Sequence, residues 1–308
     1  MQKSRLFGLL TAGLLVALSL SANAAQKDHF NVCWTIYAGW MPWEYAGSQG
    51  IVDKWAKKYG IKIDVTQLND YVESINQYTA GQFDGCTMTN MDALTIPAAG
   101  GVESTALIVS DFSNGNDGIV LKGTGKKVAD LKGMKIRVQG NPVFIETIND
   151  MGGNGIAMAT GEIFSALQTG VIDGAENNPP TYFQHNHYQN AKFFTMTEHL
   201  ILPEPIVMSK ATWEKLNPEQ QALVKKLARE AQMEERALWD KSSADAEVKL
   251  KAAGVEFITL TPELKKAFYD ATQPVRDKFG APYKDLISRI EAVQTNPALA
   301  AASTQAAQ

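Results

Sequence analysis

Cysteine and histidine are both scarce in this sequence, and this limits the chemistry it can support. Its 308 residues include two cysteines and four histidines. Two cysteines cannot build a multi-bridge disulfide scaffold or a structural zinc site. His185 and His187 stand two residues apart without a third ligand nearby, so we expect them at the surface. We therefore expect neither a metal ion nor a cofactor.

Positive charge is not in excess either. The chain has 29 Lys and Arg against 33 Asp and Glu, which gives a formal net charge of −4. Nucleic acids and anionic membranes attract clustered cations, so we exclude nucleic acid as a partner. The sequence also has no Gly-x-Ser-x-Gly elbow and no phosphate-binding loop, so it carries neither of these catalytic signatures.

Long apolar runs are absent beyond the amino-terminal segment. Residues 6–20 form one apolar run, which follows Lys3 and Arg5 and precedes the small residues Ala22 and Ala24. The run is shorter than the ~20 residues that span a bilayer. The pattern predicts a cleaved secretory signal peptide over residues 1–24 and a periplasmic mature chain; a retained membrane anchor is the weaker alternative.

Strand and helix patterns alternate along most of the remaining chain. The expected helices cover residues 51–59, 72–81, 92–99, 142–150 and 161–169. The expected strands cover residues 29–37, 61–68, 84–89, 104–109, 119–121, 134–138, 154–158, 171–174 and 255–260. This alternation predicts an α/β protein with two lobes, each with a parallel sheet covered by helices on both faces.

The carboxyl third predicts a long helix. Asn217 is an N-cap, Pro218 takes the first helical position and Gln220 the third, and no Gly or Pro follows until Gly254. A helix of ~36 residues is ~54 Å long, more than one such lobe is wide, so we expect it to span both lobes. Further helices are expected over residues 261–278 and 283–293.

These patterns divide the chain into five parts. Residues 25–121 are expected to form lobe one and residues 122–212 lobe two. Residues 213–294 hold the bridging helix and the carboxyl-terminal helices, and residues 295–308 are expected to be a disordered tail behind them. In lobe one, Cys33 and Cys86 would lie on neighbouring parallel strands, which rarely offer the Cα separation of a disulfide, so we expect two buried thiols.

An exported chain of this organisation resembles periplasmic solute-binding proteins, which have a two-lobed, hinged fold of type II-like topology. Four segments closely resemble the solute receptors of TRAP (tripartite ATP-independent periplasmic) transporters: 130–138 (DLKGMKIRV), 158–170 (MATGEIFSALQTG), 173–180 (DGAENNPP) and 197–200 (TEHL). This resemblance covers about residues 128–293 and implies a receptor that delivers a small carboxylate to a membrane permease.

The amino-terminal lobe resembles a different family. The segments 33–43 (CWTIYAGWMPW) and 71–85 (YVESINQYTAGQFDG) are similar to ABC-type receptors of the nitrate, sulfonate and taurine class, especially those associated with urea-like compounds. The resemblance covers about residues 28–131. It implies a mosaic, and it leaves a receptor for a nitrogen-containing solute with an ABC permease as the alternative.

Candidate solute contacts follow from topology, because ligands of open parallel sheets lie beyond the carboxyl ends of the strands. In lobe one the candidates are Trp40, Trp43, Tyr71, Asn90 and Asp92. The aromatic rings would grip a small solute, and Asp92 would accept a hydrogen bond. The alternatives are core packing for the two tryptophans and a helix cap or surface charge for the acid.

In lobe two, Arg137 ends an expected strand, where its guanidinium could hold a carboxylate by two parallel hydrogen bonds. The TRAP resemblance implies the same role, with Asn177 assisting and Asn178 beside it. The alternative is a structural ion pair between Arg137 and Glu176. Together the two half-sites favour a mono-acid that carries a nitrogen or a hydroxyl group.

The sequence therefore predicts a non-catalytic periplasmic receptor of a TRAP-type transporter. It would close around a small organic carboxylate and present it to permease subunits. An enzyme on the same fold, with Asp92 as general base, and a receptor that feeds a sensor domain remain as alternatives.

Overall fold

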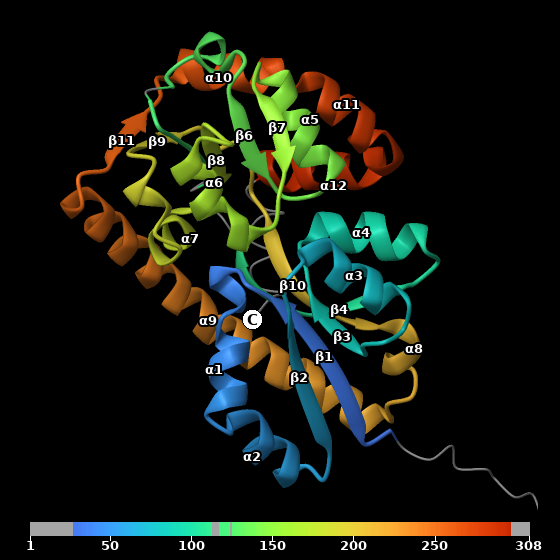
Figure 1. The fold of residues 1–308 in the computed structure, drawn as a ribbon. Helices are drawn as coiled ribbons and strands as arrows, with labels where there is room; N and C mark the ends of the chain where they lie inside the picture. The colour runs from blue at the N-terminus through green and yellow to red at the C-terminus, as the bar shows by residue number, and fades with distance from the viewer. Residues whose placement is uncertain (1–26, 113–116, 124, 297–308) are drawn as a thin grey trace, which may run out of the picture.

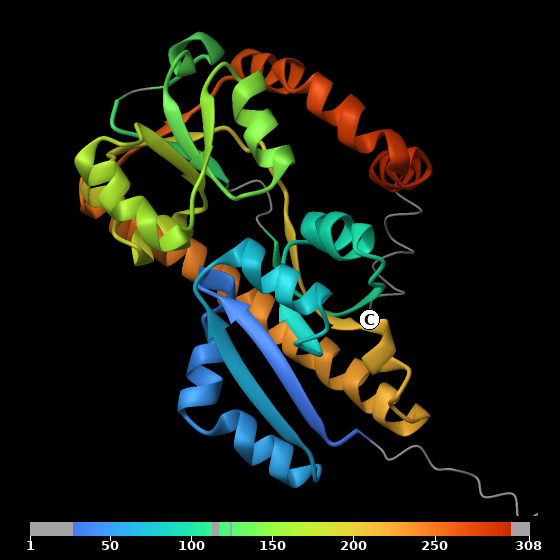
Figure 2. The same ribbon diagram turned by 45° about the vertical axis from the view of Figure 1, so that its right-hand side comes forward.

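The computed structural model describes residues 27–112, 117–123 and 125–296, and its strands form two separate sheets with helices packed around each (Figures 1 and 2). The predicted two-lobed α/β architecture is confirmed. The expected signal peptide lies outside the described residues. So does the expected tail, except for Thr295, the last residue of helix α12, and Asn296.

Lobe one is built on a five-stranded sheet of order β2-β1-β3-β10-β4. The strands are β1 (His29–Thr35), β2 (Lys62–Leu68), β3 (Gly85–Thr87), β4 (Ser104–Phe112) and β10 (Pro203–Ser209). β1 is parallel to β2 and β3, whereas β10 is antiparallel to β3 and β4. The prediction of an all-parallel sheet is therefore wrong here. Parallel neighbours must be joined by a crossover connection, usually a helix on the sheet face. The chain enters β10 from lobe two without such a crossover, and β10 runs antiparallel to its neighbours.

Lobe two is built on a six-stranded sheet of order β11-β9-β5-β8-β6-β7. The strands are β5 (Gly118–Leu121), β6 (Lys135–Val138), β7 (Asn154–Ala157), β8 (Gly174–Asn177), β9 (Phe193–Met196) and β11 (Glu256–Thr259). β5 enters from lobe one and runs antiparallel to β8 and β9, so this sheet is mixed too. β8 starts three residues later than expected, since the apolar residues Val171 and Ile172 precede the strand instead of belonging to it. The strand consequently ends at Asn177.

Three segments connect the lobes. The chain crosses between β4 and β5, returns between β9 and β10, and crosses again along helix α9 (Pro218–Ala252). The lobe limits expected from the sequence therefore differ from the sheets, since β5 belongs to lobe two and β10 to lobe one. In a hinge motion, a few residues of such connecting segments absorb the change in backbone angles.

Helix α9 confirms the expected bridging helix. Its capping box joins Asn217 and Gln220, each side chain bonding the other residue's backbone N–H at 2.9 Å. The helix contacts β4 of lobe one and helix α7 (Pro179–Gln184) of lobe two, and both views show it running past the two lobes.

Shorter helices cover the two sheets. Lobe one has η1 (Ala38–Trp40), α1 (Pro42–Ser48), α2 (Ile51–Lys58), α3 (Tyr71–Thr79), α4 (Asn90–Ala99) and α8 (Lys210–Trp213). Lobe two has η2 (Val128–Leu131), α5 (Pro142–Asp150), η3 (Thr160–Glu162), α6 (Ile163–Thr169), α7 and η4 (His187–Gln189). The carboxyl-terminal helices α10 (Pro262–Ala271), α11 (Gln273–Gly280), η5 (Ala281–Tyr283) and α12 (Lys284–Thr295) also pack on lobe two.

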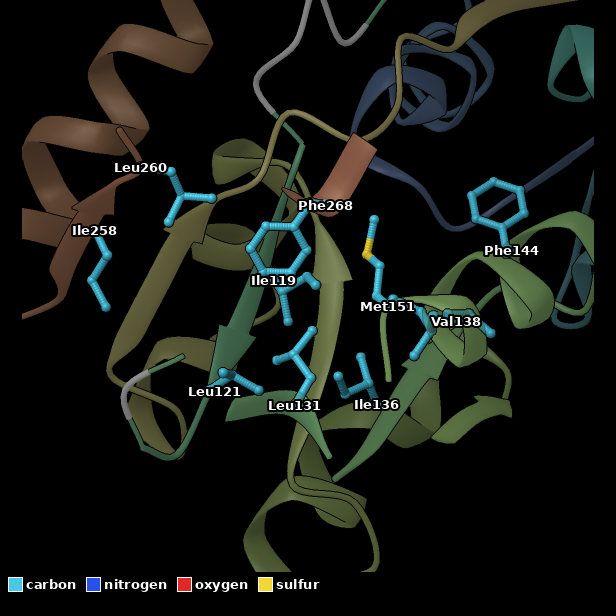
Figure 3. Packing of buried hydrophobic residues seen from close by; sticks show 11 residues of the cluster. Ile119, Leu121, Leu131, Ile136, Val138, Phe144, Met151, Ile258, Leu260 and Phe268 are labelled. Carbon is cyan, nitrogen blue, oxygen red and sulfur yellow. The ribbon is translucent and has the colours of Figure 1, made fainter. Parts of the chain in front are cut away.

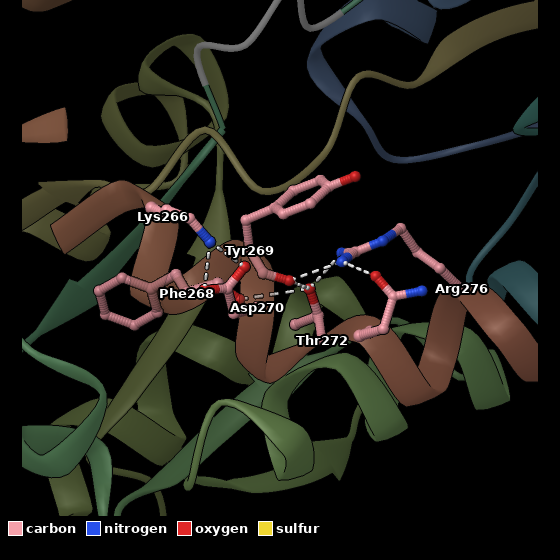
Figure 4. A network of polar contacts seen from close by, with 7 residues as sticks. Lys266, Phe268, Tyr269, Asp270, Thr272 and Arg276 are labelled. Atoms are coloured by element: carbon pink, nitrogen blue, oxygen red, sulfur yellow. Dashed lines mark hydrogen bonds and ion pairs between the residues drawn. The ribbon is translucent and has the colours of Figure 1, made fainter. Parts of the chain in front are cut away.

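The helix expected over residues 261–278 is broken at Thr272 into α10 and α11. Pro274 has no N–H to donate into a continuing helix. Figure 4 shows how Arg276 closes the gap: its guanidinium donates to Thr272 Oγ1 and to the Tyr269 carbonyl, both at 2.7 Å, and lies 3.6 Å from the Tyr269 ring centre. The carbonyl at the end of α10 is thereby satisfied.

Each lobe has its own apolar core. Lobe two has two apolar clusters, and Figure 3 shows the one in which side chains from β5, β6, α5, β11 and α10 meet. It contains Ile119, Leu121, Leu131, Ile136, Val138, Phe144, Ile148, Met151, Ile258, Leu260 and Phe268. The lobe-one cluster contains Cys33, Trp34, Trp40, Tyr71, Ile75, Tyr78, Cys86, Met88 and Val207.

Cys33 and Cys86 form a disulfide, so the expectation of two free thiols is wrong. The two residues are direct partners in the parallel pairing of β1 and β3, with a Cα–Cα distance of 4.5 Å. Neighbouring strands lie ~4.8 Å apart, so two cysteines placed directly opposite each other fall within the range that a disulfide spans. Sequence patterns do not give this register.

Candidate functional site

A pocket lies between the two lobes. Lobe one supplies Tyr37, Trp40 and Thr89, and the segments around the crossings supply Asp117, Leu202 and Glu204. Lobe two supplies Gln139, Phe144, Glu176, Asn177 and Asn178. Because both lobes and two of their connections line this pocket, a solute held here would join the two halves of the molecule.

Trp40 lines the pocket and carries a buried hydrogen-bond donor. It follows β1 on the one-turn helix η1, and its ring stacks on Tyr71 with centroids 5.5 Å apart. Its indole Nε1 is buried and has no hydrogen-bond partner among the described residues. A buried N–H without a partner costs free energy, so it would gain from a solute oxygen.

The other lobe-one candidates lie outside the pocket lining. Trp43 is half-buried on α1 and packs against the lobe-one core, and Asn90 is half-buried at the start of α4. Tyr71 and Asp92 are buried behind the pocket: the Tyr71 hydroxyl donates to Asp92 Oδ2 at 2.5 Å, and Thr89 Oγ1 donates to the same oxygen at 2.7 Å.

Arg137 is fully buried at the end of β6, beside the pocket. Its Nε donates to the Met158 carbonyl at 2.8 Å, and its Nη2 donates to Gln139 Oε1 at 3.1 Å and to Thr160 Oγ1 at 3.3 Å. Among the described residues it forms no ion pair within 4.0 Å. These neutral partners fix the guanidinium without neutralising it, which keeps its charge available to an anion.

Three acidic side chains line the same pocket. Burial raises the pKa of Glu176 to about 8, Arg137 opposes that shift and Asp117 adds to it. Burial also lowers the pKa of Arg137 to about 10, and Glu176 opposes that shift. At neutral pH Glu176 is therefore mainly protonated and can donate a hydrogen bond, while Arg137 stays charged.

His187 is 1% exposed, so the expectation that it lies at the surface is wrong. It begins η4, which packs against α6 and α7, and burial lowers its pKa to about 3. His185 is half-buried, with its ring centre 5.6 Å from that of His187. Within the described part of the chain no three His, Cys, Asp or Glu side chains cluster as metal ligands would.

The structure thus brings Trp40, Asn177 and Asn178 to the pocket and places Arg137 next to it. Sequence reasoning missed Tyr37, Gln139, Asp117 and Glu204. Tyr37 and Gln139 follow β1 and β6, so the rule that ligands lie beyond strand ends could have found them. Asp117 and Glu204 lie where the chain has just crossed between lobes, and no local pattern marks a crossing.

The chain matches a known family from its middle to near its carboxyl end. Residues 112–282, more than half of the chain, match the family model of bacterial extracellular solute-binding protein, family 7. The chain belongs to this family. Across the described residues, no helix is both long and apolar enough to cross a bilayer.

Solved structures extend the likeness to both lobes. A TRAP periplasmic solute-binding protein from Pseudomonas putida F1 with bound D-glucuronate is 46% identical, with a TM-score of 0.72, and the match covers 87% of this chain and 98% of that one. A TRAP receptor from Citrobacter koseri with bound D-glucuronate matches at 32% identity over 85% and 98% of the two chains. Its TM-score is 0.70, against 0.64 for the apo, open structure from the same organism.

Sequence comparison gives shorter matches. A solute-binding protein of Chromohalobacter salexigens is 39% identical over 165 residues, which are 54% of this chain and 48% of that protein. The chain thus spans about half the length of the first curated relatives it matches. None of these comparisons supports the expected likeness of lobe one to ABC-type receptors, because the TRAP structures cover that lobe as well.

Proposed function

We propose that this chain is the solute receptor of a TRAP transporter and that it binds a hydroxylated mono-carboxylate, with D-glucuronate as the first candidate. The observation that carries the proposal is the fully buried, charged Arg137 beside a pocket lined by three acids. The glucuronate-bound structures of similar receptors support the same solute class.

The pocket chemistry separates this class from others. The guanidinium of Arg137 suits one carboxylate, which forms strong charge-assisted hydrogen bonds with it. Asp117 and Glu204 suit hydroxyl donors of a sugar, and the ring of Trp40 offers a flat apolar face. A dicarboxylate would bring its second charge toward these acids, and a cation would be repelled by Arg137.

The receptor role implies an exported protein with a membrane partner. The amino-terminal segment 1–24 and the extracellular family both support a periplasmic location. We propose that the closed, loaded receptor docks on the permease subunits of its transporter and releases the solute unchanged. Nuclear magnetic resonance of D-glucuronate after incubation tests the last point, since a new product would favour an enzyme.

Calorimetry with Arg137→Ala tests the solute site. Loss of a charged hydrogen-bonding group corresponds to about 10- to 150-fold weaker binding of D-glucuronate. Arg137→Lys should recover little of this, because an ammonium cannot form two parallel bonds. Arg289→Ala, at an exposed position of α12, is the matched control. Unchanged affinity in Arg137→Ala would overturn the assignment.

A thermal-shift screen tests the solute class. D-Glucuronate and D-galacturonate should raise the melting temperature more than succinate, D-glucose or D-glucosamine at equal concentration, since a ligand stabilises only the state that binds it. A larger shift with the neutral or the cationic sugar would place specificity in the acids and Trp40 instead of Arg137.

A further inference from the structure

Two helices of lobe two begin with the same Asn-Pro pair, and the amino-terminal end of each faces lobe one. Asn141 is the N-cap of α5 and Asn178 the N-cap of α7, and a proline follows each. Their side-chain oxygens accept hydrogen bonds from Val143 N at 2.8 Å and from Thr181 N at 3.0 Å. Both capping oxygens are thereby committed to their own helices.

A committed oxygen fixes the direction of the amide nitrogen. Asn141 Nδ2 donates to Asp92 Oδ1, and Asn178 Nδ2 donates to Tyr37 Oη at 2.6 Å. Asp92 and Tyr37 belong to lobe one, so each capping asparagine makes a hydrogen bond between the lobes. The orientation of each amide follows from its cap, because turning it over would face an NH₂ group toward a backbone N–H.

Asp92 is held as a fixed acceptor for this bond. Its side chain is fully buried, and its other oxygen accepts from Tyr71 and Thr89 of its own lobe. The adjacent Met91 packs against the lobe-two cluster that Figure 3 shows. An opening movement would separate Asp92 from Asn141 while leaving its lobe-one partners in place.

We propose that Asn141 and Asp92 form a closure latch, which bonds only when the lobes close, and that Asn178 and Tyr37 form a second one at the pocket itself. This deepens the proposed receptor function: the solute contacts and the latches together would stabilise the closed state. Asn141 and Asp92 do not line the pocket, so their effect on affinity would act through closure.

The chain holds its own control. Asn217 also precedes a proline and caps a helix, α9, by accepting from Gln220 N at 2.9 Å, but it is exposed and makes no hydrogen bond between the lobes among the described residues. Aspartate caps helices about as well as asparagine does. Asn141→Asp and Asn217→Asp therefore both keep the helix cap. Only Asn141→Asp removes a donor between the lobes, and it places a second carboxylate opposite that of Asp92.

The test measures D-glucuronate affinity, dissociation rate and the radius of gyration from X-ray scattering, with and without the sugar acid. Asn141→Asp should bind about 10- to 100-fold more weakly, mainly through faster dissociation, and should compact less. Its melting temperature and that of Asn217→Asp should stay close to the unchanged protein, and Asn217→Asp should bind normally.

The reciprocal variant keeps the proposal falsifiable. In Asp92→Asn with Asn141→Asp, the new amide oxygen can still accept from Tyr71 and Thr89 while its nitrogen donates to the carboxylate introduced at position 141, so affinity should return to within about 3-fold. Normal binding by Asn141→Asp, or no recovery in the double variant, would overturn the latch. If the unchanged protein does not bind D-glucuronate, the proposed solute fails instead. The affinity comparison is then made with the compound that raises the melting temperature most in the thermal-shift screen, and equal affinities of Asn141→Asp and Asn217→Asp for that compound would overturn the latch.

Discussion

The buried carboxyl group of Glu176 should make the stability of the protein depend on pH. Its pKa rises from an ordinary value of 4.5 to about 8 in the folded state. A group with a raised folded pKa stabilises the fold fully below its unfolded pKa, and that contribution is lost as pH rises through about 8. His187 acts in the opposite sense, because its lowered pKa removes stability as pH falls from 6.5 toward about 3.

Glu176→Gln isolates the first of these effects. We expect the free energy of unfolding of the unchanged protein to fall relative to that of Glu176→Gln between about pH 5 and pH 8, since the glutamine cannot ionise. Urea unfolding of both proteins across this range measures the difference, in which the His187 contribution cancels. A difference that stays constant with pH would mean that Glu176 is not shifted.

Trp40 offers a second test at the residue level, because a substitution can remove its N–H while keeping an aromatic ring. Trp40→Phe keeps an aromatic ring against Tyr71 but removes the buried donor. We expect about 2- to 10-fold weaker binding of D-glucuronate, the size of one neutral hydrogen bond. Trp55→Phe on α2, where the tryptophan is exposed, should change nothing. Equal affinities in calorimetry would mean that the indole N–H does not meet the solute.

Among the helices and strands, the pairing of β1 with β3 should depend most on the disulfide that joins them. The Cys33–Cys86 disulfide closes a sequence separation of 53 residues, and it lies in the same core cluster as Trp40 and Tyr71. Disulfides that close loops of this length contribute typically about 2–4 kcal/mol. The double variant Cys33→Ala/Cys86→Ala should therefore unfold at a lower denaturant concentration.

Chemical reduction gives the control for this prediction. Dithiothreitol should lower the unfolding midpoint of the unchanged protein and leave that of the double variant where it is. A midpoint of the unchanged protein that does not respond to the reductant would mean that the two thiols are free in solution, as the sequence alone suggested.

The sequence predicted the helices and strands that are determined by their own residues, through caps and the spacing of apolar side chains. The capping box at Asn217 and the apolar spacing behind it were sufficient for α9. β10 was missed because Pro203 and Pro205 argue against a central strand. The structure accommodates them at the strand start and at a register irregularity against β4. The antiparallel orientation of β5 in the lobe-two sheet and of β10 in the lobe-one sheet was missed for a related reason, since crossings between lobes are set by tertiary packing.

The same distinction holds for the candidate site. Trp40 was predicted because it follows a strand, and Asn178 because the TRAP resemblance places it beside Asn177; both lie in the pocket. Asp92 was expected to touch the solute, yet the structure engages it with Tyr71, Thr89 and Asn141. Nothing in the order of residues indicates that its nearest donor in lobe two would be 49 positions away in the chain.

At the scale of the whole molecule, α9 contacts both lobes. Trp239 projects from its middle, is 7% exposed, and has its ring centre 6.4 Å from that of Tyr37. Tyr37 in turn lines the pocket and accepts the hydrogen bond of Asn178. The helix therefore supports a residue that belongs to both the pocket and the proposed second latch.

Trp239→Ala should consequently weaken both stability and binding. Removing a buried tryptophan costs about 3–5 kcal/mol in unfolding free energy, and Tyr37 would lose the ring that packs behind it. Leu238→Ala, one position away on the same helix and 61% exposed, should stay within about 0.5 kcal/mol and bind D-glucuronate normally. Urea unfolding and calorimetry of both variants make the comparison. If Trp239→Ala loses stability but keeps its affinity, α9 only holds the lobes together, and the position of Tyr37 is set within lobe one.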